Sequence, residues 1–242
     1  RDIRNYGRID LAKVIQKSSN VGASKIALAM PGKSLWRVHN GMGFGMTTGS
    51  GYPGEVEGVL THSAEWRQID QATLAFGYGM AVTPLQLARA YAVLANDGVL
   101  LPTSFLKQNE QARGERVLQS ATVKQLRKML EKVVSAEGTG NKARIAGYRV
   151  AGKTGTIKKT AADGGYADDR YISVFAGMAP VSDPRLVMVV MVNEPRAEVY
   201  YGGEVAAPVF SKVMAGALRL MGIAPDKVDE KSVHLAAVGE PQ

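Results

Sequence analysis

The spacing of apolar residues changes along this 242-residue chain, and that change restricts the fold more than any other feature of the sequence. Up to about residue 136, apolar positions recur at helical spacing, whereas residues 171–178 and 186–192 have the pattern of strands. Residues 186–192 are apolar at consecutive positions, so both faces of that strand are expected to be buried. Helices, then closely spaced strands, then a last helix predict an α+β fold with an antiparallel sheet.

The clearest helix signal is Thr83-Pro84, where Thr is a good N-cap and Pro fits the first helical position. Apolar residues then recur at helical spacing, and Asn96-Asp97-Gly98 ends the helix. Residues 43–61 are rich in Gly, Pro and Thr and are predicted to be a loop. Further helices are predicted at residues 9–16, 23–30, 34–42, 121–134 and 204–221.

Strands are predicted at residues 148–151, 171–178 and 186–192, with residues 179–184 joining the last two as a hairpin. We expect residues 1–224 to be part of a single domain, with a largely helical part over about 1–136 and an antiparallel sheet flanked by helices over about 145–222. Residues 225–242 are predicted to be a loose tail.

Composition excludes several classes of function. The charge is +8, but the basic residues are scattered and not interleaved with aromatics, so a solvated surface explains them and no nucleic-acid partner is expected. The absence of cysteine excludes disulfides, thiolate zinc sites and a cysteine nucleophile. His39, His62 and His234 have no partner at metal-ligand spacing, so we expect neither a metal nor another cofactor.

The beginning of the chain indicates a fragment. Residue 1 is arginine, no secretory signal follows it, and no run of 18 apolar residues occurs. We therefore expect membrane contact only through a segment absent from this chain.

Residues 147–154, Gly-Tyr-Arg-Val-Ala-Gly-Lys-Thr, match the phosphate-binding pattern GxxxxGK[ST], which would make the protein a nucleotide hydrolase. That loop needs a hydrophobic strand before it and a helix after it, so that backbone N–H groups cradle the phosphate. Here residues 137–144 are polar and Gly-rich, and no helix signal follows Thr154. The context therefore argues against nucleotide binding.

The same residues contain a second pattern, Lys153-Thr154-Gly155-Thr156. On a strand alternate side chains share a face, so Lys153 points one way and the hydroxyls of Thr154 and Thr156 point the other. Gly152 and Gly155 indicate places where another backbone comes close, and an extended peptide could pair along such a strand. Taken alone, the pattern is better explained by an edge strand that ends in a turn.

A third pattern, Ser18-Ser19-Asn20, lies between the first two predicted helices. Taken alone, it is best explained as the N-cap of the second helix. A serine and an asparagine at this spacing can also aim a hydroxyl and an amide into one cleft. The Ser18 hydroxyl beside the Lys153 ammonium could relay a proton, and the Asn20 amide could hold a peptide carbonyl.

In this order, the two motifs resemble those of the penicillin-binding transpeptidases, with residues 18–20 as the Ser-x-Asn motif and residues 153–156 as the Lys-Thr-Gly motif. Residues 77–98, beginning Gly-Tyr-Gly-Met-Ala-Val-Thr-Pro, are similar to a helix entry of class B members. Residues 200–210 resemble the C-terminal helix of the division-specific, penicillin-binding protein 3-like type. The resemblance covers about residues 8–224 and implies the transpeptidase fold of that family.

One motif of that family is missing, the Ser-x-x-Lys that carries the nucleophilic serine. The residues before Ser18 contain no serine. The one match, Ser104-Phe-Leu-Lys107, lies between the other two motifs in a stretch without a helix signal, and the pair needs a helical turn to share a face. We treat this match as a coincidence and expect the nucleophile outside this chain.

The resemblance implies a serine-type D-Ala-D-Ala transpeptidase that cross-links peptidoglycan stem peptides during septal cell-wall synthesis through an acyl-enzyme. It implies that Lys153 and Ser18 pass a proton to the leaving amine and that Asn20 holds the substrate amide. By the same resemblance, the stretch Thr154-Gly155-Thr156 binds the substrate.

Two details of substrate binding follow from the resemblance. The hydroxyls of Thr154 and Thr156 bind the terminal carboxylate, and the backbone N–H of Thr156 forms half of the oxyanion hole. Tyr78 either lines the cleft or belongs to the core.

The implied partners are stem peptides ending in D-Ala-D-Ala, β-lactam antibiotics, and other cell-division and cell-wall synthesis proteins, at the periplasmic face of the bacterial inner membrane. Two alternatives share the fold. One is a non-catalytic β-lactam-sensing or cell-wall assembly module. The other is a penicillin hydrolase, which the sequence favours less because no glutamate-bearing loop for deacylation is recognisable.

Overall fold

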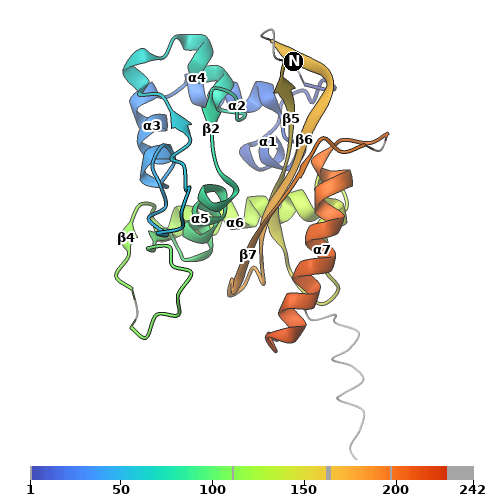
Figure 1. Cartoon of the computed structure of the whole chain (residues 1–242). Helices are drawn as coiled ribbons and strands as arrows, with labels where there is room; N and C mark the ends of the chain where they lie inside the picture. Colours follow the sequence, from blue (N-terminus) through green and yellow to red (C-terminus); the bar gives the residue numbers. More distant parts are fainter. Residues whose placement is uncertain (1, 111, 162–164, 197, 228–242) are drawn as a thin grey trace, which may run out of the picture.

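The protein is described by a computed structural model that covers residues 2–110, 112–161, 165–196 and 198–227. A helical part lies beside a three-stranded antiparallel sheet, and a long helix covers the opposite face of the sheet (Figure 1). The predicted order of helices, strands and a last helix is confirmed. Within these ranges no helix combines the length and the apolar character that crossing a membrane requires.

The sheet is formed by three strands that follow one another in the chain. Strand β5 (Ala151–Thr160) pairs antiparallel with β6 (Tyr166–Ala179), and β6 pairs antiparallel with β7 (Leu186–Asn193). The predicted hairpin between the last two strands is confirmed. Since the order is β5-β6-β7, β5 and β7 are the outer strands of the described sheet.

Most helix predictions agree with the structure to within a few residues. Helix α5 begins after Thr83, whose hydroxyl accepts a hydrogen bond from the Gln86 N–H, while the Gln86 side chain accepts one from the Thr83 N–H. This capping box confirms the predicted start. The helices are α1 (Leu11–Lys17), α2 (Asn20–Leu28), α3 (Gly32–Gly41), α4 (Gln68–Leu74), α5 (Pro84–Ala95), α6 (Ser120–Val134) and α7 (Gly202–Leu220).

Short elements connect the helices, and the sequence pattern did not indicate them. Within the predicted loop 43–61, two residues form a strand that pairs with residues after α4. The short elements are β1 (Val59–Leu60), β2 (Met80–Ala81), β3 (Val99–Leu100), β4 (Glu115–Arg116) and the 3-10 turns η1 (Ser63–Glu65) and η2 (Asn141–Ala143).

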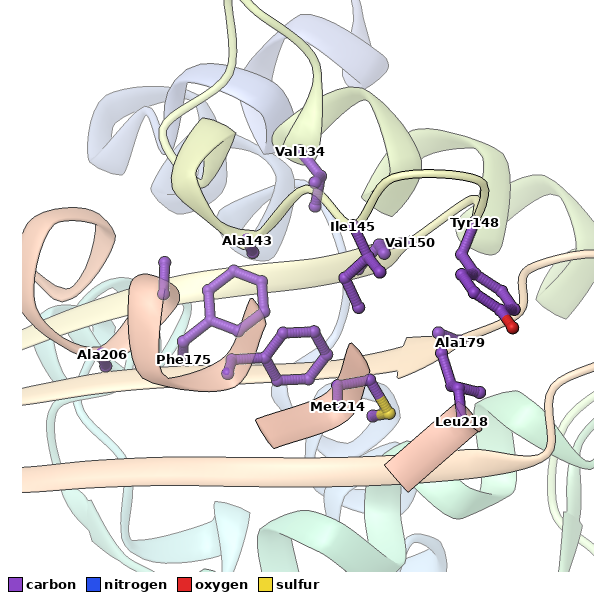
Figure 2. Close-up of a cluster of buried hydrophobic side chains, with 12 residues drawn as sticks. Val134, Ala143, Ile145, Tyr148, Val150, Phe175, Ala179, Ala206, Met214 and Leu218 are labelled. Carbon is purple, nitrogen blue, oxygen red and sulfur yellow. The ribbon is translucent and has the colours of Figure 1, made fainter. Parts of the chain in front are cut away.

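The main core lies between the sheet and α7 (Figure 2). Phe175 of β6 and Phe210 of α7 are fully buried, with ring centroids 4.7 Å apart. Met214 and Leu218 continue the apolar face of α7 along the sheet. On the opposite face of the sheet, Met178 packs with residues of α5 and α6. Burial on both faces fixes the sheet firmly, so β5 presents its side chains from a rigid support.

The predicted strand at residues 148–151 is wrong except at its last residue. Gly147 has φ +78°, which places a turn there, and Tyr148 makes only an isolated bridge with Ile145. The Tyr148 ring is buried, and its hydroxyl donates to the Ile223 carbonyl at 2.5 Å. The apolar pattern therefore reflects burial of a turn, and strand pairing begins only at Ala151.

The predicted complete burial of residues 186–192 is also wrong. Their side chains are only partly buried, and Met191 is 50% exposed. The reason is that β7 is an outer strand, which pairs with β6 alone among the described residues.

The predicted loose tail begins later than residue 225. The Asp226 carboxylate accepts hydrogen bonds from the Arg149 N–H at 2.7 Å and from the Ser182 N–H and hydroxyl at 3.1 and 2.9 Å. These bonds tie residue 226 to the end of the sheet. The rest of the predicted tail, residues 228–242, lies outside the described residues.

Candidate active site

Lys153 lies near the start of β5, where the chain is already paired with β6 opposite Ala176. Its neighbour Gly152 is needed for close packing, since a Cβ there would lie 2.6 Å from the Ala176 carbonyl oxygen. The expected close backbone approach is therefore confirmed at Gly152. At Gly155 a Cβ would meet only Val174, at 3.5 Å, so space does not require a glycine there, although the backbone of Gly202 lies close to the Gly155 carbonyl.

Ser18 and Ser19 alone connect α1 to α2. Ser18 ends α1 in the left-handed conformation, with φ 55° and ψ 48°. Ser19 is buried and caps α2, because its hydroxyl accepts a hydrogen bond from the Gly22 N–H at 2.9 Å. The N-cap interpretation of the Ser-Ser-Asn sequence is thus correct for Ser19, and it leaves the Ser18 hydroxyl exposed.

The two motifs meet although 135 residues separate them. The Lys153 ammonium Nζ donates a hydrogen bond to Ser18 Oγ at 2.8 Å and another to the Thr154 carbonyl at 2.9 Å. The structure therefore brings Ser18 and Lys153 together, as the sequence predicted.

Contacts between α1 and the segment after α6 explain this convergence. The Gln16 amide donates to the Ser135 hydroxyl at 3.1 Å, and the Lys17 ammonium donates to the Glu137 carbonyl at 2.6 Å. The Lys13 ammonium lies 3.1 Å from the Glu137 carboxylate. The helical corner is thus fastened to the segment that leads into β5.

Burial lowers the pKa of Lys153 from its ordinary value of 10.5 to about 8. No carboxylate among the described residues forms an ion pair with it, so no attraction offsets the cost of removing its charge from water. An amine with a pKa near neutrality, bonded to a hydroxyl, can both donate and accept a proton at physiological pH.

Asn20 is the first residue of α2 and its side chain is exposed. The helix start therefore places the amide two residues beyond Ser18, on the solvent side of the same corner. A primary amide in that position can donate to a carbonyl and accept from an N–H of a ligand.

The two threonines of β5 make contacts of their own. Thr154 Oγ1 lies 2.9 Å from Thr139 Oγ1, and Thr156 Oγ1 accepts a hydrogen bond from the Gly202 N–H at 3.0 Å. Gly202 begins α7, which covers the face of the sheet opposite α5 and α6. The expected alternation along β5 thus agrees with these contacts, since Lys153 turns to Ser18 and Thr156 turns to α7. Because Thr156 accepts from Gly202, its own O–H remains able to donate.

Tyr78 is partly buried and belongs to an aromatic group that joins the two parts of the molecule. Its ring centroid lies 5.7 Å from that of Phe76 and 5.4 Å from that of Tyr166, at the start of β6. Both rings meet Tyr78 edge to face. Tyr78 is thus neither in the main core nor in hydrogen-bond contact with Lys153.

Several residues near the site were not singled out from the sequence. Thr139 is one, and it carried no signal within the polar stretch after α6. Tyr171 is another, and its ring stacks on that of Tyr200 from the stretch 200–210, with ring centroids 3.9 Å apart beside Tyr201. Tyr200 follows the sheet by several residues, so only the fold brings these rings together.

The alternative motifs do not have the structure that they need. Lys153 and Thr154 lie inside a strand, and no helix follows them, which excludes the phosphate-binding loop. Residues 104–107 are not helical, so Ser104 and Lys107 lack the geometry of a Ser-x-x-Lys pair. Among the described residues there is no cluster of three or more His, Asp or Glu side chains that could hold a metal ion.

Comparisons with known proteins show the family to which this chain belongs. Residues 1–215 match the family described as penicillin binding protein transpeptidase domain. The chain is 46% identical over 226 residues to peptidoglycan D,D-transpeptidase FtsI of Escherichia coli K12, covering 93% of this chain and 38% of that protein. It is 42% identical over 227 residues to probable peptidoglycan D,D-transpeptidase PenA of Neisseria flavescens, covering 94% of this chain and 56% of that protein.

A solved structure shares the fold. The apo transpeptidase domain of Burkholderia pseudomallei penicillin-binding protein 3 superposes with a TM-score of 0.89 at 41% identity, covering 94% of this chain and 69% of that one. The chain spans 38% of the length of the Escherichia coli relative and 56% of the length of the Neisseria flavescens relative. With a family match over most of its length, the chain belongs to the penicillin-binding protein transpeptidase domain family.

Proposed function

We propose that this chain forms the C-terminal part of a peptidoglycan D,D-transpeptidase that cross-links stem peptides ending in D-Ala-D-Ala during septal wall synthesis. The observation that carries the proposal is the 2.8 Å hydrogen bond between the Lys153 amine and the Ser18 hydroxyl, with Lys153 at a lowered pKa. The family and the two named relatives support the same chemistry. Residues 1–224 form part of one domain, which works at the periplasmic face of the inner membrane together with other wall-synthesis proteins.

The proposed reaction begins on a serine that this chain does not supply. That serine, in a Ser-x-x-Lys motif, gives its proton to the lysine of the motif and attacks the carbonyl of the penultimate D-Ala. An ester forms, the peptide bond breaks, and the terminal D-Ala leaves as its amine. Lys153 and Ser18 deliver the proton that the leaving amine takes up. An amine of a second stem peptide then attacks the ester, which forms the cross-link and releases the serine. We call this chain together with the segment that carries the serine the complete domain.

The strand β5 is suited to hold such a peptide because its outer edge is unpaired among the described residues. In the proposed complex, Asn20 holds the substrate amide and the Thr156 N–H donates to the oxyanion. Thr154 and Thr156 bind the terminal carboxylate through their hydroxyl hydrogens, with the Lys153 charge nearby.

The test of the proposed function has two steps on the complete domain. A fluorescent penicillin should give a stable covalent adduct, and a D-Ala-D-Ala-type thioester should be turned over. An adduct without turnover would favour the sensing module, and rapid release of the penicillin would favour a hydrolase. Failure of both reactions would contradict the proposal.

The pKa of Lys153 predicts a pH dependence. Because the ammonium form supplies the proton, the rate of acylation should fall as the pH rises through about 8, where Lys153 loses its charge. An unperturbed lysine would lose it only above 10. Stopped-flow acylation with a penicillin between pH 6 and 10.5 measures this, and a rate that stays constant up to pH 10 would remove Lys153 as the proton donor.

A further inference from the structure

The middle residue of the Ser-Ser-Asn sequence has a second partner besides the helix that it caps. While Ser19 Oγ accepts from the Gly22 N–H, it donates its own hydrogen to the Asp2 carboxylate, with 2.6 Å between Oγ and Oδ2. The other oxygen of that carboxylate, Oδ1, accepts from the Val21 N–H at 3.1 Å. Asp2 therefore holds the hydroxyl of Ser19 and the first turn of α2 at the same time.

The corner that Asp2 holds is strained. Ser18 adopts the left-handed conformation, which costs a non-glycine residue free energy unless its surroundings enforce it. Two residues alone join α1 to α2, so the backbone torsions of Ser18 and Ser19 decide where the Ser18 hydroxyl points. A group that holds Ser19 in place therefore also restricts the backbone torsions of Ser18.

Close packing of α2 on α1 leaves the backbone of this corner little room to move. A Cβ on Gly22 would lie 2.6 Å from Val14 Cγ2, so α2 already rests directly on α1.

The negative charge of Asp2 also suits its position at the start of α2. Burial opposes its ionisation, but the hydrogen bonds from Ser19, Val21 and Asn20 outweigh that effect and lower the pKa of the Asp2 carboxyl. Asp2 is thus a carboxylate at neutral pH.

We propose that Asp2 is a positioning residue of the active site, which clamps Ser19 and the first turn of α2 and thereby aims the Ser18 hydroxyl at Lys153. The Asp2 carboxylate bonds to Ser19 and Val21 and not to Lys153. Its contribution is to keep Ser18 in the left-handed conformation, where the proton path to the leaving amine is complete. This inference rests on the proposed function of the Ser18–Lys153 pair.

The test compares Asp2→Ala with a matched control in the complete domain. Asp10→Ala removes a carboxylate of the same kind, which caps α1 by accepting from the Lys13 N–H at 2.7 Å, far along the helix from Ser18. With a fluorescent penicillin, Asp2→Ala should lower the acylation rate at least about tenfold and leave the affinity before acylation nearly unchanged. Asp10→Ala should change neither quantity, although both variants lose a helix cap.

Three further readouts separate positioning from general loss of stability. Because Asp2 acts through Ser19, the double variant Asp2→Ala/Ser19→Ala should be no slower than the slower single variant. In Asp2→Asn, which keeps one acceptor oxygen, the rate should recover in part. Nuclear magnetic resonance should show the pKa of Lys153 falling further below its ordinary value in Asp2→Ala, because the ammonium loses the Ser18 hydroxyl that accepts its hydrogen bond, and unchanged in Asp10→Ala.

The inference is overturned if Asp2→Ala is acylated as fast as Asp10→Ala, if the losses of Asp2→Ala and Ser19→Ala multiply, or if the Lys153 titration does not move. The proposed function is tested separately, because it fails when the wild-type complete domain is not acylated. In that case the Lys153 titration still decides whether Asp2 positions Ser18.

Discussion

Replacing Lys153 with alanine is expected to lower the acylation rate of the complete domain by about 10²- to 10⁴-fold, the range typical of a lost acid–base group. In the proposed mechanism, the variant removes both the proton donor and the positive charge that attracts the substrate carboxylate. Fluorescent penicillin acylation, followed over time, measures the loss. A near-normal rate would exclude Lys153 from the mechanism.

The best control is Lys159→Ala. Lys159 lies on the same strand at a position of the same parity, but its ammonium pairs with the Glu194 carboxylate at 2.5 Å and not with Ser18. That surface pair contributes little, so this variant should be acylated at the wild-type rate.

Removal of the Lys153 charge should not destabilise the fold. The folded-state pKa lies below the unfolded value, so at neutral pH burial of the ammonium costs stability, and this cost disappears as the pH rises from about 8 to 10.5. The difference from 10.5 to about 8 corresponds to roughly 3 kcal/mol at most. Lys153→Met, which keeps most of the side-chain volume, should therefore unfold at the same or a higher denaturant concentration at pH 7.

Replacing Gly202 with alanine is expected to lower the free energy of unfolding by about 3 kcal/mol. A Cβ at Gly202 would lie 2.3 Å from the Gly155 carbonyl oxygen and 2.4 Å from that of Val174. Both atoms are backbone of the sheet, so neither can move without shifting β5 or β6. Since the Gly202 N–H also bonds to Thr156, acylation should slow as well.

Gly216 provides the control for this prediction, because it lies in the same helix and a Cβ there meets nothing within 4 Å. Gly216→Ala should raise the free energy of unfolding by about 0.5–1 kcal/mol, the usual gain of alanine over glycine in a helix. Urea denaturation of both variants measures the difference. Equal effects of the two substitutions would contradict the packing argument.

The sequence predicted best what depends on local chemistry. Thr83-Pro84 marked the start of α5 because a hydroxyl cap and a proline act within one helical turn. Tyr148 was misassigned because its apolar neighbours are buried in a turn, and burial produces the same composition as a strand. The exposure of Met191 could not be predicted, since it depends on which strand lies at the outside of the sheet.

The sequence predicted the site only in part, because most of its contacts join residues that lie far apart in the chain. Ser18 and Lys153 could be paired only through a resemblance, because no local pattern connects residues 135 positions apart. Thr139 and Asp2 had no signal, since their roles come from hydrogen bonds to Thr154 and Ser19 that only the folded chain creates.

The open edge of β5 has a consequence for the behaviour of the protein in solution. Within the described part of the chain, no strand pairs with the outer edge of β5, and such an edge can pair with the extended backbone of a second copy as well as with a peptide. This strand carries three lysines, Lys153, Lys158 and Lys159, within seven positions of its length. Lysine is a residue that natural sheet edges use against pairing with one another, so we expect these side chains to make association of two β5 edges less favourable.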